Sequence, residues 1–334
     1  MIKKSKVATK TTLIILISII FIGIIYIIAS QKISASSGVF SLINYARIKG
    51  SQTPSPKNNN IDIDSPGSLA LFSQAIRIST DNYVDKGNQL ADGKPLIVAA
   101  VATDKNANNY DSQLMVLASI KDKNILKIVG LTSYSTLQKK LNDIDQLKYL
   151  KSIGIIGFTY NTEGQHTPKE EMRSLTSAQS DNSVAKFASL AKANGFISLW
   201  VPPGEDILNR ASVDAAKLMF KSGLDGIVIQ EQRLIENSCV EDRVKAVQNI
   251  INKYKTAAGK DLIIGMQVMP SRCTTANTYG VAHCNGSSEK WSHCSKFISE
   301  LNNSINFISI WASAKPDVDN LPEFSNMIRK IMSK

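Results

Sequence analysis

Short apolar runs recur along the chain from residue 95 to residue 311, each bounded by glycine, proline or polar residues. Runs of about four to eight apolar residues that end in turn residues predict buried strands. Seven such runs lie at residues 95–101, 125–131, 153–160, 196–201, 226–230, 262–268 and 305–311. An eighth strand is missing, irregular or hidden within residues 69–78.

Segments with the apolar spacing of helices separate these runs. Ser135 is a suitable N-cap for the helix predicted after it, and Pro168 suits a first helical turn. Asn194-Gly195 is a good C-cap for another helix. The predicted helices lie at residues 112–120, 136–150, 168 onward, 183–193, 212–221, 241–258, 288–302 and 321–332. Strands that alternate with helices indicate βαβ units and a parallel sheet.

The fold expected from this alternation is a (β/α)8 TIM-type barrel in residues 68–334, either complete or with one strand irregular or missing. Such barrels typically need roughly 250 residues. An open doubly wound sheet is the alternative. The turn after the first run, Ala102-Thr103-Asp104-Lys105, contains no glycine. It therefore lacks the phosphate-binding loop that is typical of nucleotide-binding sheets.

The N-terminal region predicts export. Residues 11–30 include the apolar stretch LIILISIIFIGIIYIIA and reach the roughly 20 residues that span a bilayer. Four lysines precede this segment and only Lys32 follows closely, so the positive-inside rule predicts a signal anchor with residues 1–10 in the cytoplasm. A signal peptide cleaved near Ser34-Ala35-Ser36 is the alternative. Either way, the barrel domain is expected outside the cytoplasm.

Residues 31–67 are rich in Ser, Asn, Pro and Lys, which predicts a flexible linker. The net charge of the chain is +11, but beyond the N-terminal tail its Lys and Arg residues form no block. We therefore expect a basic surface near an anionic membrane or cell wall, and no nucleic-acid partner.

The four cysteines fit an oxidising compartment. Cys239, Cys273, Cys284 and Cys294 all lie in the last third of the chain, and an even count predicts two disulfides with three possible connectivities. The preferred pairing is Cys239 with Cys273 and Cys284 with Cys294, because the first pair would join adjacent loops. The repeated His-Cys pairs at residues 283–284 and 293–294 offer zinc ligation as the alternative. No Cys-x-x-Cys spacing is present, so we expect neither a metal nor another cofactor.

Polar residues follow the predicted strands, where parallel α/β folds bind their ligands. Side chains alternate along a strand, so one parity faces the barrel interior. The parity that carries small or polar residues is assigned to the interior. It comprises Gly157, Thr159, Asn161 and Glu163, then Ser198 and Trp200, then Val228, Gln230 and Gln232, then Gly265 and Gln267, then Ser309 and Trp311.

Aromatic faces stack on the C–H surface of a sugar, and amides bond its hydroxyls. The predicted carbohydrate-binding residues are Tyr160, Asn161, His166, Trp200, Gln230, Gln232, Gln267 and Trp311. The alternative is that the tryptophans belong to the core and the glutamines bond one another.

Glycoside hydrolysis normally needs two carboxyl groups on either side of the bond. Glu163 is the candidate general acid, with His166 as an alternative proton carrier. Candidates for the second carboxylate are Glu231 and Glu236, with Asp206 and Asp104 behind them, and none stands out.

The segment Lys221-Ser222-Gly223-Leu224-Asp225-Gly226-Ile227-Val228-Ile229 resembles the approach to the catalytic strand of family 18 chitinases. That family continues Asp-Gly-x-Asp-x-Asp-x-Glu. Here Val228 and Gln230 replace the two aspartates and Gln232 replaces the glutamate. The resemblance therefore implies a barrel without the chitinase chemistry.

The chain also resembles secreted, glycosidase-like TIM-barrel proteins of unassigned activity. The shared motifs are Tyr160-Asn161-Thr162-Glu163 followed by Thr167-Pro168-Lys169-Glu170, and the strand end Ile229-Gln230-Glu231-Gln232. This resemblance covers about residues 150–315. It implies a barrel more firmly than an activity. Together with the anchor predicted at residues 11–30 and the polar strand ends, we expect a membrane-anchored barrel that acts on or binds a carbohydrate of the cell envelope or surroundings. A non-catalytic glycan-binding or structural surface protein is the alternative.

Overall fold

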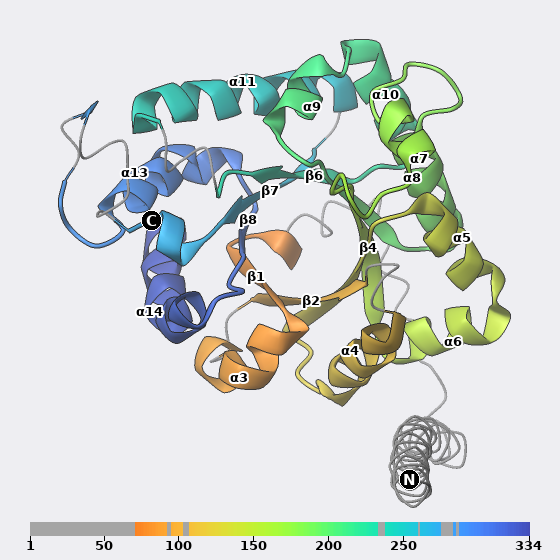
Figure 1. The fold of residues 1–334 in the computed structure, drawn as a ribbon, viewed down its shortest axis with the longest axis horizontal. Coiled ribbons are helices and arrows are strands. Elements are labelled where there is room, and N and C mark those ends of the chain that lie inside the picture. The colour runs from red at the N-terminus through yellow and green to blue at the C-terminus, as the bar shows by residue number, and fades with distance from the viewer. Residues whose placement is uncertain are drawn as a thin grey trace, which may run out of the picture. The chain divides into compact units, whose positions relative to one another are not determined.

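The structure is a computed structural model that describes residues 71–91, 95–102, 107–232, 238–259, 261–274, 283–284 and 287–334. Its strands form one closed barrel in the order β1 to β8, and every neighbouring pair is parallel. Helices surround the barrel (Figure 1). The predicted TIM-type barrel is therefore confirmed.

The strands lie where the apolar runs predicted them. They are β1 Ala75–Ser79, β2 Leu96–Ala102, β3 Ile125–Leu131, β4 Ile155–Asn161, β5 Ile197–Val201, β6 Gly226–Gln230, β7 Ile263–Val268 and β8 Phe307–Ile310. The eighth strand is β1, which overlaps residues 69–78 and closes the barrel between β2 and β8. It was hard to recognise because Arg77 interrupts its apolar residues.

The helices fill the gaps between strands. The described ones are α3 Thr80–Ala91, α4 Ala107–Ser119, α5 Tyr134–Asn142, α6 Ile144–Ser152, α7 Lys169–Ser174, α8 Ser183–Ala193, α9 Glu205–Arg210, α10 Val213–Lys221, α11 Val240–Ala258, α13 Ser292–Leu301 and α14 Lys315–Met332. The 3-10 turns are η3 Pro270–Arg272 and η5 Asn302–Ser304.

The helix predicted at residues 136–150 is two helices. Asp143 has an extended backbone, and its carboxylate caps α6 by accepting the Asp145 and Gln146 N–H groups at 3.0 and 3.1 Å. The cap of α5 is Ser133 rather than Ser135, because the Ser133 hydroxyl accepts the Thr136 N–H. Short side chains that bond nearby backbone favour such breaks.

Two apolar layers hold the barrel together. The outer layer packs the helices against the strands. The inner layer comes from the strands and the segment before β1, and it includes Phe72, Ala75, Ile97, Ala99, Ile128, Ile197, Leu199, Val201, Val228, Ile263 and Phe307. The Phe72 and Phe307 rings lie 5.8 Å apart, near the amino-terminal ends of the strands. The apolar filling therefore lies toward this end of the barrel.

The inner layer also tests the predicted parity. Val228, Ile263 and Phe307 face inward, so Gln230, Gln267 and Ser309 lie on the inward side as predicted. The prediction is wrong for β5. There Leu199 and its alternating neighbours fill the interior, and Trp200 packs with the helices.

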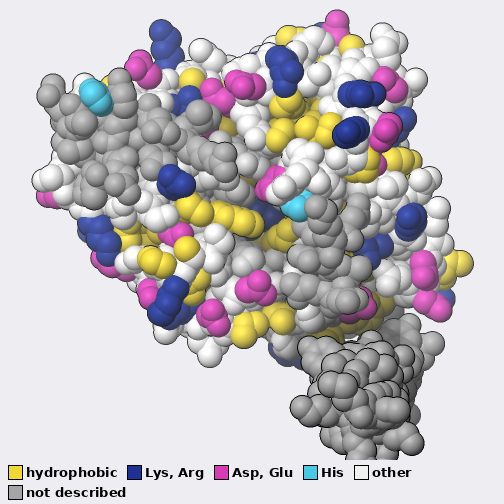
Figure 2. Space-filling model, in the orientation of Figure 1, with side chains coloured by type: hydrophobic (Ala, Val, Ile, Leu, Met, Phe, Trp, Pro, Cys, Tyr) yellow, Lys and Arg dark blue, Asp and Glu magenta, His cyan; other side chains and the backbone are white. Residues whose placement is uncertain are grey.

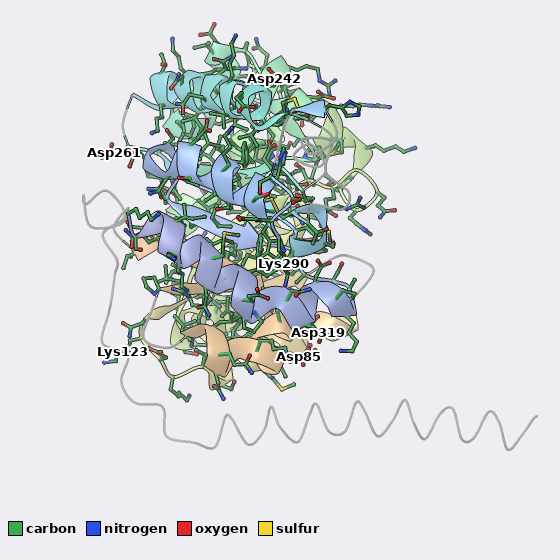
Figure 3. All side chains as sticks on the ribbon, turned by 90° about the vertical axis from the view of Figure 1, so that its left-hand side faces the viewer. Asp85, Lys123, Asp242, Asp261, Lys290 and Asp319 are labelled. Atoms are coloured by element: carbon green, nitrogen blue, oxygen red, sulfur yellow. A yellow bond between two sulfur atoms is a disulfide. The ribbon has the colours of Figure 1, made fainter. Side chains whose placement is uncertain are left out.

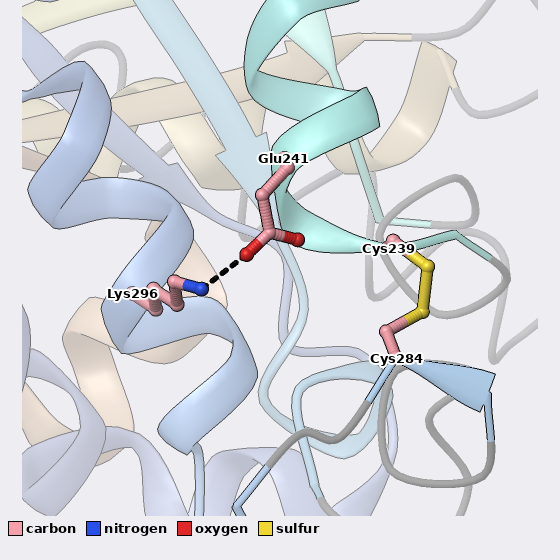
Figure 4. The surroundings of a disulfide bond; sticks show 4 residues. All are labelled: Cys239, Glu241, Cys284 and Lys296. Atoms are coloured by element: carbon pink, nitrogen blue, oxygen red, sulfur yellow. Dashed lines mark hydrogen bonds and ion pairs between the residues drawn. A yellow bond between two sulfur atoms is a disulfide. The ribbon is translucent and has the colours of Figure 1, made fainter.

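Two disulfides are present, Cys239–Cys284 and Cys273–Cys294, with Cα–Cα distances of 5.6 and 5.4 Å. The predicted pairing is therefore wrong. Cys273 directly follows η3, and the first turn of α13 brings Cys294 to it. Cys239 precedes α11 and bonds Cys284 in the following loop, beside an ion pair between Glu241 of α11 and Lys296 of α13 (Figure 4).

The zinc alternative is not supported, because all four sulfur atoms form disulfides. Within the described ranges, no group of three or more His, Cys, Asp or Glu residues could hold a metal ion.

The predicted anchor at residues 11–30, the tail before it and the linker at residues 31–67 lie outside the described residues. No helix in the part of the chain that the structure describes is long and apolar enough to cross a bilayer.

Charged side chains project outward from the surrounding helices and loops (Figure 3), as Asp85, Lys123, Asp242, Asp261, Lys290 and Asp319 illustrate.

Peptide mapping by mass spectrometry without reductant should find peptides joined through Cys239–Cys284 and Cys273–Cys294. Replacing both Cys273 and Cys294 with Ala should lower the free energy of unfolding by about 3 kcal/mol, because the bridge closes a loop of moderate length. Recovery of a Cys239–Cys273 peptide from the folded protein would contradict the structure.

Gly265 of β7 should not tolerate a side chain. A Cβ atom there would lie 2.3 Å from the Phe307 ring, which fills the barrel interior. We expect Gly265→Ala to lower the free energy of unfolding by about 1–3 kcal/mol in urea denaturation. Gly164→Ala is the matched control, because a Cβ atom at Gly164 meets nothing within 4 Å. Equal midpoints for the two variants would argue against this packing.

Candidate binding site at the carboxyl-terminal mouth

Four adjacent strands place a row of polar side chains in the barrel interior. Gln230 of β6 is in register with Gln267 of β7, Gln267 with Ser309 of β8, and Ser309 with Arg77 of β1. All four lie on the inward side, because Ala75, Val228 and Phe307, each two residues away, belong to the inner layer, and so does Ile263, four residues before Gln267. We call the carboxyl-terminal end of the interior the mouth. One side of the mouth is therefore polar.

Arg77 is the charged member of this row. Its side chain is 8% exposed, and its Nη1 donates to the Ser309 hydroxyl at 2.9 Å. That hydroxyl donates in turn to Gln267 Oε1 at 3.4 Å. Burial lowers the pKa of Arg77 to about 10, so the guanidinium remains charged at neutral pH.

Strand β4 supplies the opposite side of the mouth. The Thr159 hydroxyl lies close to Gly130 of β3, and Asn161 is half-buried two residues further along β4. Asn161 Nδ2 donates to the Glu163 carboxylate at 3.4 Å. The Glu163 carbonyl accepts the His166 N–H at 2.9 Å, which closes a turn. The side chains of Asn161 and Glu163 are therefore bonded to each other, and the His166 backbone lies next to them at the same strand end.

Several buried polar atoms in this region have no hydrogen-bond partner within the described ranges. They are Arg77 Nε, Thr159 Oγ1, Asn161 Oδ1, His166 Nδ1, Gln230 Nε2 and Gln232 Oε1. Buried polar groups are normally paired, and such a cluster calls for water or a ligand. The glutamines satisfy one another only in part, through a single bond of 3.3 Å from Gln232 Nε2 to Gln230 Oε1.

Trp311 follows β8 and lies two residues beyond the inward-facing Ser309, and its side chain remains 37% exposed. Near the centre of the face in Figure 2, hydrophobic, basic, acidic and histidine side chains lie close together. The described part of the mouth therefore combines an accessible aromatic ring with amides and one guanidinium.

Two predicted binding residues lie behind the barrel wall. Tyr160 is fully buried, and its ring stacks on that of Phe187 of α8 with the ring centroids 4.6 Å apart. Its hydroxyl donates a hydrogen bond of 2.5 Å to the Glu171 carboxylate. Burial, with Glu171 second, raises the pKa of Tyr160. Trp200 is also fully buried, and its indole N–H donates to the Thr162 hydroxyl at 3.1 Å. Both side chains point toward the helices, because they have the outward parity of their strands.

Glu231 is likewise misplaced for catalysis. It is fully buried on the outer side of the barrel, where its carboxylate accepts hydrogen bonds of 2.9 Å from Arg243 of α11. The same guanidinium pairs with Glu205 of α9. Burial raises the pKa of Glu231 to about 8, although Arg243 opposes this shift. Two carboxylates share one guanidinium, so the cluster favours a proton on the more deeply buried carboxylate.

The other candidates for a second carboxylate give no pair with Glu163 in the described ranges. Asp206 is exposed on α9. Glu236 and Asp104 lie outside the described residues.

Arg77 and Ser309 are the site residues that the sequence did not nominate for binding. The available signal was a charged residue between the isoleucines of a short apolar run, Ala75–Ser79.

Neither a protein-family model nor a curated protein matches the sequence. Solved structures with a similar fold include Mycobacterium tuberculosis tryptophan synthase, with 8% identity, a TM-score of 0.48, and coverage of 84% of this chain and 99% of that chain. Another is a Rhizomucor miehei beta-1,3-glucanosyltransferase mutant in complex with laminaritriose, with 14% identity, a TM-score of 0.46, and coverage of 73% and 88%. These low values carry no functional argument.

The raised pKa of Glu231 predicts a pH-dependent stability. The folded chain keeps a proton that the unfolded chain loses above its ordinary pKa of 4.5. The free energy of unfolding should therefore fall as the pH rises from about 4.5 to about 8, by about 1–3 kcal/mol. Urea denaturation at pH 5 and pH 8 measures this fall.

Glu231→Gln should reduce the fall, because its neutral amide cannot titrate. Glu170→Gln is the control, since Glu170 is exposed on α7. Parallel pH dependences for the wild-type protein and Glu231→Gln would refute this assignment.

Proposed function

We propose that the barrel binds a carbohydrate at its mouth. The observation that carries the proposal is the group of buried polar atoms that lack partners within the described ranges, next to the accessible ring of Trp311. A sugar supplies hydroxyl groups that can both donate to and accept from amides, and C–H faces that pack on an indole. A purely structural barrel would be expected to have apolar or mutually bonded side chains at these positions.

Binding is better supported than hydrolysis. Glu163 lies at the mouth, but the other half-buried or buried carboxylates that follow the described strands are already engaged. Glu171 bonds Tyr160 and the start of α5, and Glu231 and Glu205 bond Arg243. A second carboxylate facing Glu163 is what the usual hydrolytic mechanisms require. Glu163 is accordingly assigned to the ligand-binding rim, where Asn161 orients it.

The location belongs to the same proposal. The two disulfides are typical of an oxidising compartment outside the cytoplasm, and the sequence of residues 11–30 suits a membrane anchor. The protein would then present its mouth to glycans of the cell envelope or the surroundings.

Fluorescently labelled glycans titrated against the full chain, in a detergent without a sugar headgroup, test the proposal. We expect saturable binding that Trp311→Ala weakens by roughly 5–10-fold, because the variant loses ring packing on the sugar. Val213→Ala is the control, since Val213 is a similarly exposed apolar residue on α10. An equal loss of affinity in both variants, or no binding to any glycan, would contradict the proposal.

The same mixtures distinguish binding from turnover. We expect no new reducing ends after incubation with the wild-type protein. Glycan cleavage that is abolished by Glu163→Gln would reject the binding-only form and restore the role of Glu163 as general acid.

A further inference from the structure

Arg77 has no opposite charge next to it in the part of the chain that the structure describes. The side chain enters the interior from β1, where Ala75 marks the inward parity. Among the described residues, only its Nη1 finds a partner, the Ser309 hydroxyl at 2.9 Å. Its Nε is buried and unpartnered. The Nε donor of this guanidinium therefore has no partner among the described residues.

The contrast with Arg243 shows what a structural arginine looks like in this protein. Arg243 is 7% exposed, nearly the same as Arg77, yet it pairs with both Glu231 and Glu205. An unpaired buried charge is costly, so folding alone gives no reason to keep one. Residues that violate this rule tend to belong to functional sites.

The surroundings of Arg77 hold the guanidinium in place without neutralising it. Ser309 accepts from Nη1 while its own proton points to Gln267, and Gln267 is held in register between β6 and β8. Each of these partners is neutral. The short chain of bonds therefore orients a positive charge on the same side of the mouth as Gln267, whose strand pairs with the strand of Gln230.

We infer that Arg77 binds the carboxylate of an acidic sugar, so that the mouth takes uronic acids rather than neutral sugars. This inference rests on the proposed carbohydrate-binding function. The planar guanidinium matches the two oxygens of a carboxylate with parallel hydrogen bonds. Gln230 and Asn161 then face the hydroxyls of the ring, and Trp311 packs on its C–H face. The ligand supplies the negative charge that the described part of the barrel interior lacks.

Isothermal titration calorimetry of the full chain with glucuronic acid, glucose and acetate tests the inference. We expect glucuronate to bind roughly 10–100-fold more tightly than glucose, because the charge-assisted pair forms only with the acid. Arg77→Gln should remove the preference for glucuronate, so that its affinities for glucuronate and glucose become similar. The affinity of Arg77→Lys for glucuronate should lie between those of the wild-type protein and Arg77→Gln, since lysine keeps the charge and lacks the planar guanidinium. Arg210→Gln, at an exposed position on α9, is the control.

Stability supplies a measurement that does not depend on the choice of sugar. Without ligand, Arg77→Met should unfold at the same urea concentration as the wild-type protein or at a higher one, because it removes a buried charge that has no carboxylate partner among the described residues. A clearly lower midpoint would mean that Arg77 serves the fold, and would overturn the inference. Saturating glucuronate should raise the midpoint of the wild-type protein and not that of Arg77→Met.

The three titrants separate this inference from the proposed function. Equal affinity for glucuronate and glucose would retain carbohydrate binding and reject the role of Arg77. Arg77-dependent binding of acetate, without binding of either sugar, would retain the anion site and reject the carbohydrate. The absence of binding to all three would reject both.

Discussion

Side-chain alternation in a closed barrel is the constraint on which the rest of this structure depends. Every second residue of each strand must enter one narrow interior that is sheltered from water except at its ends. In this chain the interior is apolar near Phe72 and Phe307 and polar near Gln267 and Ser309. The apolar end contributes to the stability of the barrel, and the polar end leaves hydrogen-bonding groups without partners within the described ranges. The proposed binding site is thus the part of the core whose polar groups the described residues do not fully pair.

The two buried arginines show opposite ways of keeping a charge inside a protein. Arg243 lies between the barrel and its outer helices, and it satisfies two carboxylates from different elements. That cluster joins α9, α11 and the end of β6, at the cost of raising the pKa of Glu231. Among the described residues, Arg77 is held only by a neutral hydroxyl. The first arrangement resembles a structural connection, and the second has the donors left over that ligand recognition requires.

The disulfides crosslink the connections that follow β6 and β7. Cys273–Cys294 joins the end of β7 to the first turn of α13, and Cys239–Cys284 joins the start of α11 to the same connection. Crosslinks of this kind limit the freedom of the unfolded chain. They hold the ends of β6 and β7, which carry Gln230 and Gln267, within a crosslinked frame.

The sequence by itself determined the barrel, because the alternation of apolar runs and amphipathic segments depends on local periodicity. It also located Asn161, Glu163 and the glutamines at strand ends. It misassigned Trp200 and Glu231, since a polar or aromatic residue on a short strand can face either side when both faces are buried. Only the tertiary structure decided those orientations, the disulfide pairing and the isolation of Arg77, because each depends on which distant residues the closing barrel brings into contact.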